Sequence, residues 1–180
     1  MAFIKRKKEE KKKVDNNPII ANSPEELLFF AKEHGISIEP LDVTELTKKL
    51  GIQMRMEPME GEESGCLKKD KLGKWIMIIN SLQHPHRQRF TIAHELGHFI
   101  KHTIIKESFV DTTFFRNEES NPMEHEANKF AAELLMPKDL FVSYIENISQ
   151  QVNDLAKHFQ VSSMAVRIRA KQLGYGGHNL

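Results

Sequence analysis

His94-Glu95-Leu96-Gly97-His98 places two imidazoles one helical turn apart, with a carboxylate directly after the first. This is the H-E-x-x-H pattern of zinc hydrolases. On a helix, residues four apart project from the same face, so His94 and His98 can both direct a ring nitrogen at one ion about 2.0–2.1 Å away. We therefore predict a helix on which His94 and His98 bind Zn²⁺.

Glu95 is the predicted catalytic residue, because it lies beside the water that such an ion holds. Zinc lowers the pKa of that water to about 7, and a neighbouring carboxylate can take its proton as the water attacks a polarised carbonyl. The implied chemistry is peptide hydrolysis. The alternative is a pair of core histidines with satisfied hydrogen bonds, since the flanking apolar residues have the spacing of a buried helix.

A third ligand is expected on a second helix, which Asn121 can cap, Pro122 can begin and Pro137 ends. Glu124 is the candidate, because a catalytic zinc takes three protein ligands and keeps one open position. Asn128 lies four residues later on the same face, where it can hold a ligand histidine by a hydrogen bond. The alternative for Glu124 is a capping box with Asn121.

At this point the chain resembles a known family, the ImmA/IrrE metallo-endopeptidases. Two segments carry the resemblance: Arg89-Phe90-Thr91-Ile92-Ala93-His94-Glu95-Leu96-Gly97-His98 and Glu124-x-x-Ala127-Asn128-x-Phe130-Ala131-Ala132-x-Leu134-Leu135-Met136-Pro137. The similarity runs from about Leu41 to about Leu173.

The resemblance implies a zinc-dependent, gluzincin-like peptidase fold. It implies His94, His98 and Glu124 as metal ligands and Glu95 as the general base. Members of the family are known for cleaving helix-turn-helix repressors of mobile elements, or for acting in DNA-damage responses. The resemblance therefore implies a protein substrate, and we expect a repressor of this type.

The predicted fold class is α+β, with a small mixed or antiparallel sheet packed on the helices that carry the zinc site. One helix is expected from Ser23 to near Gly35, with Ser23 as its cap, and another between Asp42 and Gly51. Alternating apolar residues predict a first strand at 52–56, followed by a hairpin with strands at 66–69 and 74–80. The apolar run within 75–79 indicates a strand that is covered on both faces or lies at a sheet edge.

The tail contains a second pattern, because residues 152–167 resemble a helix-turn-helix with Ser162 as the cap of its second helix. Arg167, Arg169 and Lys171 are expected to face outward on that helix. One reading places this helix in a DNA groove. We favour the other reading, in which the pair packs against the peptidase core or recognises a protein, because three basic residues are few for a DNA-binding surface.

The 180 residues suffice for one main domain. We divide the chain into a basic lead-in without fixed structure at 1–22, a zinc peptidase domain at 23–148 and a helix-turn-helix-like tail at 149–180. A formal net charge of +1 argues against a general nucleic-acid or membrane binder. Lysines and arginines gather in the lead-in. The alternative interpretation of this segment is an arm that binds nucleic acid.

A cytoplasmic location is predicted, because the sequence has no secretory apolar region and no apolar run long enough to span a bilayer. Cys66 is the only cysteine, which excludes an internal disulfide and fits a reducing compartment. We expect Cys66 to be a small buried residue, and the alternative is a thiolate that reaches and blocks the zinc.

Other polar residues receive weaker assignments. His102 is expected at the end of the zinc helix near its free carbonyls, Glu126 away from the metal, and residues 84–86 in a loop. A donor to the developing oxyanion is also needed, and the chemically able residues are Tyr144, Tyr175 and His125.

The sequence as a whole favours a zinc endopeptidase that acts on a specific protein. Two other classes stay open. One is a regulatory module with a non-catalytic zinc that sequesters a transcription factor, and the other is a DNA-binding regulator that uses the tail and the basic lead-in.

Overall fold

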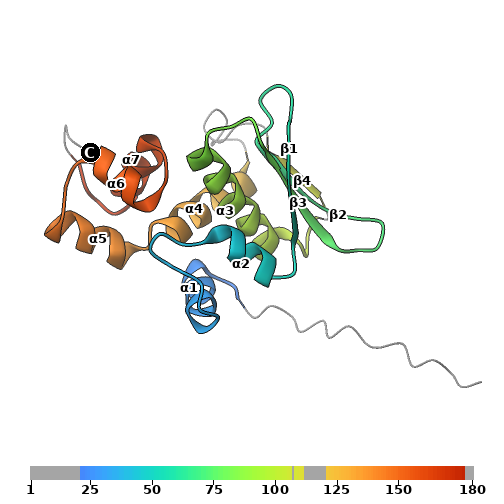
Figure 1. Cartoon of the computed structure of the whole chain (residues 1–180), viewed down its shortest axis with the longest axis horizontal. Helices are drawn as coiled ribbons and strands as arrows, with labels where there is room; N and C mark the ends of the chain where they lie inside the picture. Colours follow the sequence, from blue (N-terminus) through green and yellow to red (C-terminus); the bar gives the residue numbers. More distant parts are fainter. Residues whose placement is uncertain (1–20, 107, 112–120, 177–180) are drawn as a thin grey trace, which may run out of the picture.

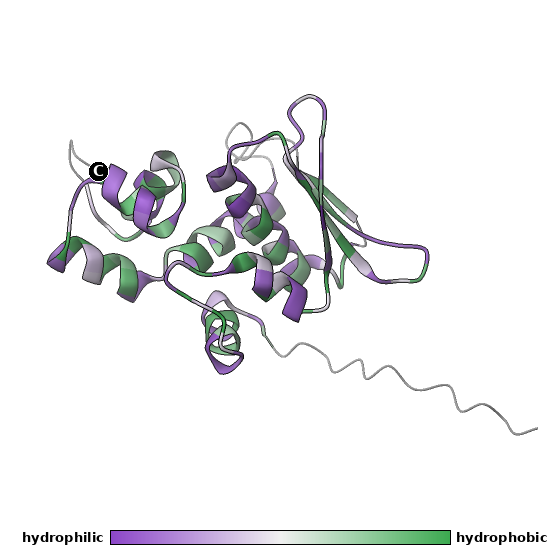
Figure 2. Cartoon of the chain, viewed as in Figure 1, coloured by the Kyte–Doolittle hydropathy of each residue, from purple (hydrophilic) through white to green (hydrophobic). Residues whose placement is uncertain are grey.

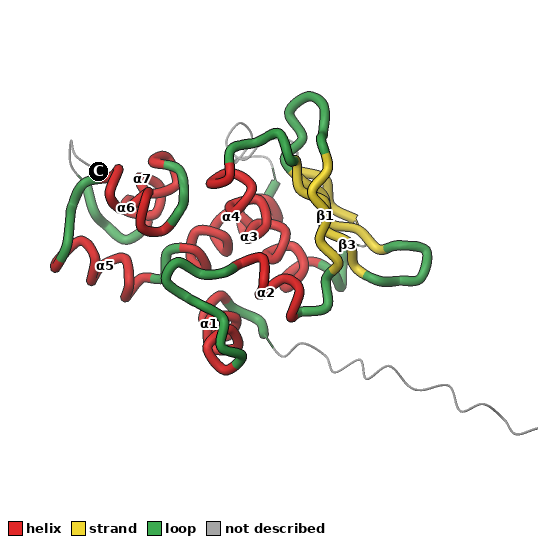
Figure 3. The backbone as a smooth tube through the Cα atoms, viewed as in Figure 1, coloured by secondary structure: helices red, strands yellow, loops and turns green. Residues whose placement is uncertain are grey.

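A computed structural model describes residues 21–106, 108–111 and 121–176. Within these residues seven helices and four strands form a mixed α+β structure, which confirms the predicted class. Helices α3 (Pro85–His102) and α4 (Pro122–Leu135) lie in the middle, between the sheet and the C-terminal helices (Figure 1, Figure 3). Most of the predicted lead-in, residues 1–20, lies outside the described residues.

Each of the two N-terminal helices begins at a capping side chain, and Ser23 is the one that was predicted as a cap. In α1 (Pro24–Glu33) the Ser23 hydroxyl accepts a hydrogen bond from the Glu26 amide at 3.2 Å. In α2 (Val43–Lys49) the Asp42 carboxylate accepts one from the Glu45 amide at 2.9 Å. Each cap satisfies an amide that has no partner inside its helix. Helix α1 packs against α4 and α2 packs against α3, so the two short helices support the central pair.

The sheet has the order β1-β3-β2-β4, with β1 parallel to β3 and the other two pairs antiparallel. Its strands are β1 (Gln53–Glu57), β2 (Gly65–Lys69), β3 (Trp75–Asn80) and β4 (Ser108–Asp111). The hairpin of β2 and β3 was predicted, whereas β4 was not. Since β3 lies between two neighbours and residues 76–80 are buried, its apolar run belongs to a strand covered on both faces.

The two faces of the sheet bury different residues. Met77 and Ile79 join the main core, while Ile76 and Ile78 pack with Cys66 in a separate cluster. Side chains alternate between faces along a strand, so Cys66 lies on the face that looks away from the main core. Burial raises the pKa of its thiol. These facts fit a buried apolar residue and argue against a thiolate at the metal.

Two glycines let the central helices approach their neighbours closely. A Cβ at Gly97 of α3 would lie 3.1 Å from the Ala127 Cα of α4 and 3.2 Å from the Phe130 Cβ. A Cβ at Gly65 of β2 would lie 2.6 Å from the Thr91 Cγ2 of α3. Distances this short leave no room for a larger residue without movement. The glycines therefore set the spacing between the two helices and between α3 and the sheet.

Three helices follow α4: α5 (Lys138–Asn147), α6 (Val152–Phe159) and α7 (Ser163–Gln172). Helix α4 stops before Pro137, as predicted, and the Ser162 hydroxyl accepts the predicted capping bond from the Ala165 amide at 3.1 Å. Helix α5 was not predicted. Helices α6 and α7 pack against each other, and α7 contacts α4.

Arg169 was predicted to face outward, and this was wrong. It is only 5% exposed, its Nε donates to the Met136 carbonyl oxygen at 3.0 Å, and its Nη1 lies 3.6 Å from Glu133. Free carbonyls at a helix C-terminus attract cations, and Met136 is the C-terminal cap of α4. Arg167 and Lys171 are exposed, as predicted.

Figure 2 shows hydrophobic residues gathered where α3, α4 and the sheet meet, with hydrophilic residues along the loops. None of the described helices combines the length and the apolar character needed to cross a bilayer.

Candidate metal centre

Helix α3 buries the whole of the H-E-x-x-H segment. Pro85 occupies its first turn and His84 caps it, accepting from the His86 amide at 3.1 Å, so residues 84–86 open the helix and do not form the loop that we expected. Every residue from Phe90 to His98 is buried. A buried pair of histidines and a carboxylate must be stabilised by partners, because leaving them unsatisfied costs free energy.

The structure brings His94, His98 and Glu124 together. Their ligand atoms all lie within 4.8 Å of one another. The Nε2 atoms of His94 and His98 are 3.0 Å apart, and the Glu124 oxygens lie 3.1 Å from His94 Nε2 and 3.4 Å from His98 Nε2.

These separations fit a zinc ion. In a tetrahedral site with bonds of about 2.0–2.2 Å, neighbouring ligand atoms are about 3.3–3.6 Å apart. The observed distances are equal to this or a few tenths of an ångström shorter, so a small outward movement would admit the ion. Two imidazole nitrogens and one carboxylate are also a donor set that catalytic zinc sites use.

The charge states of these groups suit a metal site. Burial lowers the pKa of His98 to about 4, and although its contacts with Glu124 oppose this shift, the imidazole stays neutral near pH 7. Burial alone would raise the pKa of Glu124, but its hydrogen bonds to His94 and His98 outweigh burial and hold the pKa below its usual value. A neutral imidazole and an ionised carboxylate are the forms that bind a metal.

Glu95 lies on the face of α3 that meets the sheet. Thr91, one turn earlier, packs against Gly65 of β2, and residues four apart share a helix face. Glu95 is 0% exposed. Its carboxylate is thus buried on the helix that carries both histidines, on the side toward β2.

Asn128 contacts the other nitrogen of the first histidine: its side-chain oxygen lies 3.0 Å from His94 Nδ1. Glu124 does not close a capping box, because its carboxylate faces the two histidines, while Asn121 alone caps α4 by accepting from the Met123 amide. Residues 124 and 128 thus share the face of α4 that meets α3.

His102 and Glu126 are the polar contacts that sequence reasoning missed. His102 is the last residue of α3, at the helix end as predicted, but its side chain is 3% exposed and its Nδ1 lies 3.0 Å from His98 Nδ1, so it also belongs to the buried cluster. Its Nε2 lies 3.1 Å from a Glu126 oxygen. The signal was present in the sequence, since His102 follows His98 by four residues on the same helix face.

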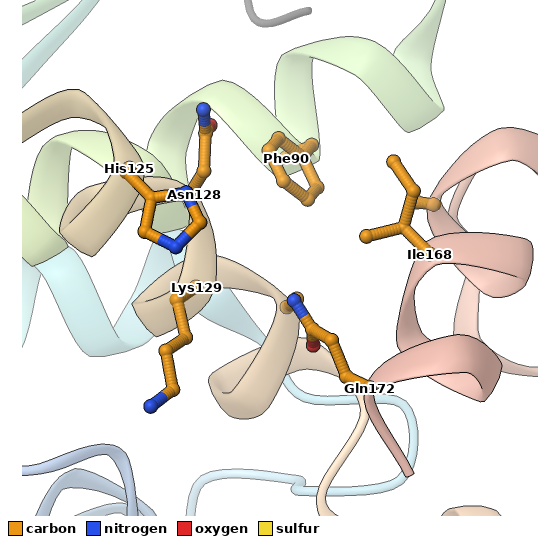
Figure 4. A pocket seen from close by; sticks show the side chains of 8 residues that line it. Phe90, His125, Asn128, Lys129, Ile168 and Gln172 are labelled. Atoms are coloured by element: carbon orange, nitrogen blue, oxygen red, sulfur yellow. The ribbon is translucent and has the colours of Figure 1, made fainter. Parts of the chain in front are cut away.

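A pocket of about 410 Å³, including space open to solvent, lies beside this centre between α3, α4 and α7. Figure 4 shows Phe90 and Ile168 on facing sides, with His125 and Lys129 on α4. Its lining residues are Phe90, His125, Asn128, Lys129, Ala132, Ala165, Ile168 and Gln172. Asn128 thus lines the pocket and also contacts His94 Nδ1, on the side of the ring opposite to the candidate metal site.

The three candidate oxyanion donors lie in different surroundings. His125 follows Glu124 on α4 and lines the pocket. The Tyr144 ring packs 4.4 Å from the His158 ring in the C-terminal helices, and Tyr175 follows α7 with its amide bonded to the Ala170 carbonyl. Of the three, His125 is therefore the one that adjoins a predicted ligand in the chain.

Comparison with known proteins gives matches over most of this chain. Residues 47–171 match the family model of the IrrE N-terminal-like domain. The metallopeptidase ImmA of Bacillus subtilis is 31% identical over 119 residues, which are 63% of this chain and 66% of ImmA. The uncharacterized immunity region protein 2 of Bacillus phage phi105 is 34% identical over 113 residues, covering 62% of this chain and 68% of that protein.

Two longer proteins match in part. The radiation response metalloprotease IrrE of Deinococcus radiodurans is 30% identical over 95 residues, which are 49% of this chain and 28% of IrrE. A solved structure, described as a Mycobacterium tuberculosis transcriptional regulator, aligns with 87% of this chain and 48% of that one, at a TM-score of 0.60 and 18% identity. This chain thus spans about two thirds of its Bacillus relatives and less than half of the longer proteins, and the structural match concerns the fold alone.

Proposed function

Because this chain belongs to the ImmA/IrrE family of metallopeptidases, we propose that it is a zinc-dependent endopeptidase that cleaves a helix-turn-helix transcriptional repressor. The observation that carries the proposal is the convergence of His94, His98 and Glu124 within 4.8 Å, with the buried Glu95 on the same helix. A zinc peptidase needs ligands for the metal and a general base beside them.

In this proposal His94, His98 and Glu124 hold the ion, and Asn128 keeps the His94 ring in place through its Nδ1. A zinc ion held there would supply a Lewis acid that can polarise the scissile carbonyl and make water acidic enough to lose a proton near neutral pH. Three ligands from the protein leave a position open for these reactants.

Glu95 moves the proton. Its carboxylate accepts a proton from the water as the water oxygen bonds to the carbonyl carbon, and then delivers that proton to the nitrogen of the leaving amine as the C–N bond breaks. Burial suits this work, because a carboxylate shielded from bulk water interacts more strongly with the charges that develop beside it.

The choice of a protein substrate draws on the relatives. Two of them are named as a metallopeptidase and a metalloprotease, and a third as an immunity region protein of a phage. A repressor connected with phage immunity fits these names. The DNA-binding alternative is weakened by Arg169, whose burial leaves Arg167 and Lys171 as the exposed cations among the three residues considered on α7.

The test compares the native chain with Glu95→Gln, using as candidate substrate a purified helix-turn-helix repressor from the same genome. We expect one zinc per chain in both proteins, measured by atomic emission, and cleavage by the native protein alone, with a loss of at least about 100-fold in the variant. Equal cleavage rates would rule out Glu95 as the base. Stoichiometric zinc and tight repressor binding without cleavage by the native chain would instead favour the regulatory binding module.

A further inference from the structure

A chain of polar contacts leads away from the candidate metal site through His98. His98 Nδ1 lies 3.0 Å from His102 Nδ1, and His102 Nε2 lies 3.1 Å from Glu126 Oε2. His98 and His102 are 1% and 3% exposed, so water does not readily replace the contact between them, whereas the Glu126 side chain at the end of the series is 53% exposed. The Phe109 ring stacks on His98 at a centroid distance of 4.5 Å and closes one side of the cluster.

When His98 binds a metal through Nε2, only one arrangement of protons satisfies the contacts from His98 through His102 to Glu126. A neutral imidazole has one donor and one acceptor nitrogen, so a His98 that uses the Nε2 lone pair carries its proton on Nδ1. That proton is donated to His102 Nδ1, which must then be the acceptor. The His102 proton is consequently on Nε2, from which it is donated to the Glu126 carboxylate.

The opposite arrangement fails at the metal. If His102 carried a proton on Nδ1, it would donate to His98 Nδ1, and the His98 proton would then lie on Nε2 and block the metal. Protons on both Nδ1 atoms would place two donors 3.0 Å apart without an acceptor. A carboxylate at the far end favours the productive arrangement, because an ionised carboxylate can only accept.

Helix α4 thereby supports both histidines of the site. Asn128 meets His94 Nδ1 directly, whereas Glu126 meets His98 Nδ1 through His102. Partners of this kind fix the orientation of a ligand ring and increase its basicity, and their loss lowers metal affinity by about 10–100-fold.

We propose that His102 and Glu126 are a positioning pair that holds His98 in the tautomer and orientation needed to bind the metal. The proposal rests on the proposed metal site. It assigns His102 and Glu126 no contact with substrate. Their contribution is to make the His98 Nε2 lone pair available and to raise its electron density.

The first test is zinc affinity by chelator competition. His102→Phe keeps a ring but removes the acceptor, and we expect zinc to bind about 10–100-fold more weakly. Glu126→Ala should weaken binding, whereas Glu126→Gln should restore part of the affinity, because its amide oxygen still accepts from His102. The matched control is His158→Phe, which breaks a similar pair, 2.8 Å from Glu39, elsewhere in the fold. It should leave zinc affinity unchanged.

Two further measurements separate positioning from simple stabilisation. Nitrogen-15 NMR of the zinc-loaded native chain should show the proton on Nδ1 of His98 and on Nε2 of His102. The Co²⁺-loaded His102→Phe variant should show a changed visible spectrum, because the ligand field depends on the His98 ring. If the role of the pair were purely structural, His102→Phe would lower the melting temperature of the metal-free protein and would leave the zinc affinity and the Co²⁺ spectrum unchanged.

The outcomes distinguish this proposal from the proposed function. If the native chain binds zinc and His102→Phe binds it equally well, the positioning pair is refuted while the peptidase proposal stands. A His102 proton on Nδ1 has the same consequence. If neither the native chain nor any variant binds zinc, both proposals fail together.

Discussion

His98 is a histidine that the protein keeps neutral by burying it. Burial lowers its pKa to about 4, against a usual value of 6.5, and its neighbours His94 and His102 act in the same direction when they are charged. A group with a depressed pKa in the folded state binds protons more readily when the chain unfolds. Acid therefore favours the unfolded chain.

This gives a prediction for the metal-free protein. Its free energy of unfolding should be highest above about pH 6.5 and should fall as the pH drops toward 4, by at most about 3 kcal/mol from His98. Glu124, whose pKa is also depressed, adds a further loss only below the usual pKa of a carboxyl, which is 4.5. Urea unfolding of chelator-treated protein at a series of pH values measures this slope.

The control for the slope is His98→Asn, which has no titrating group at that position. Between pH 6.5 and 4.5 its stability should depend on pH less steeply than that of the native chain. Identical slopes would show that the pKa of His98 is not the cause.

Among the helices, the close approach of α3 and α4 is what sets the distance between the two histidines and Glu124. Gly97→Ala adds a methyl group whose nearest neighbours include the Ala127 Cα and carbonyl oxygen, at 3.1 and 3.2 Å. Backbone atoms cannot turn aside as a flexible side chain does. The two helices must therefore separate by a few tenths of an ångström.

We expect Gly97→Ala to weaken zinc binding and to lower the free energy of unfolding by about 1 kcal/mol. Overpacking costs about 1–3 kcal/mol, and the better helix propensity of alanine offsets about 1 kcal/mol of it. Gly176→Ala is the control, since a Cβ at that position meets nothing within 4 Å. Unchanged zinc affinity and stability in Gly97→Ala would contradict this account of helix spacing.

The junction between α4 and α7 gives another prediction. Arg169→Met removes the guanidinium that donates to the Met136 carbonyl, and we expect the free energy of unfolding to fall by about 2–3 kcal/mol. Arg167→Met, on the exposed face of the same helix, should change stability by less than about 0.5 kcal/mol. Equal effects in urea unfolding would mean that the burial of Arg169 does not matter.

Local signals predicted the elements that have local causes. The caps at Ser23 and Ser162 are formed as expected, because a side-chain oxygen and an amide three residues later need nothing else. Strand β4 was missed because its four residues become a strand only by pairing with β2. The outward assignment of Arg169 failed for the same reason, since its partner Met136 lies 33 positions away.

For the candidate site, the sequence predicted which side chains share a face of one helix, but it did not predict which side chains meet between two helices. The i, i+4 relation suggested that His94 and His98 converge, and it placed Asn128 on the face of Glu124. It could not show that Glu126 reaches His102. Glu126 follows Glu124 by two residues, so the two side chains point in different directions on α4, and the contact of Glu126 with His102 depends on how α3 and α4 pack.

In the whole molecule, the C-terminal helix α7 and the two helices of the candidate metal site, α3 and α4, share a pocket. The predicted division of the chain at residue 148 stays a prediction, but α7 lines this pocket together with α3 and α4. Its facing walls are the apolar side chains of Phe90 and Ile168 (Figure 4). Asn128 lines the pocket and also contacts His94, and we predict that the proposed substrate places an apolar side chain in this pocket.

Substitution of Ile168 tests whether the pocket selects the substrate. Ile168→Glu puts a charge against Phe90, and we expect kcat/KM for the repressor to fall about tenfold or more, since burying an unpaired charge beside an apolar group is costly. Met164→Glu makes the same chemical change on α7 at a side chain that is 56% exposed and outside the pocket, so cleavage should be unaffected. Zinc content and melting temperature, measured alongside, test that both variants keep the fold. Equal cleavage by Ile168→Glu and the native chain would mean that the substrate does not enter this pocket, and equal loss in both variants would point to the charge of the helix surface instead.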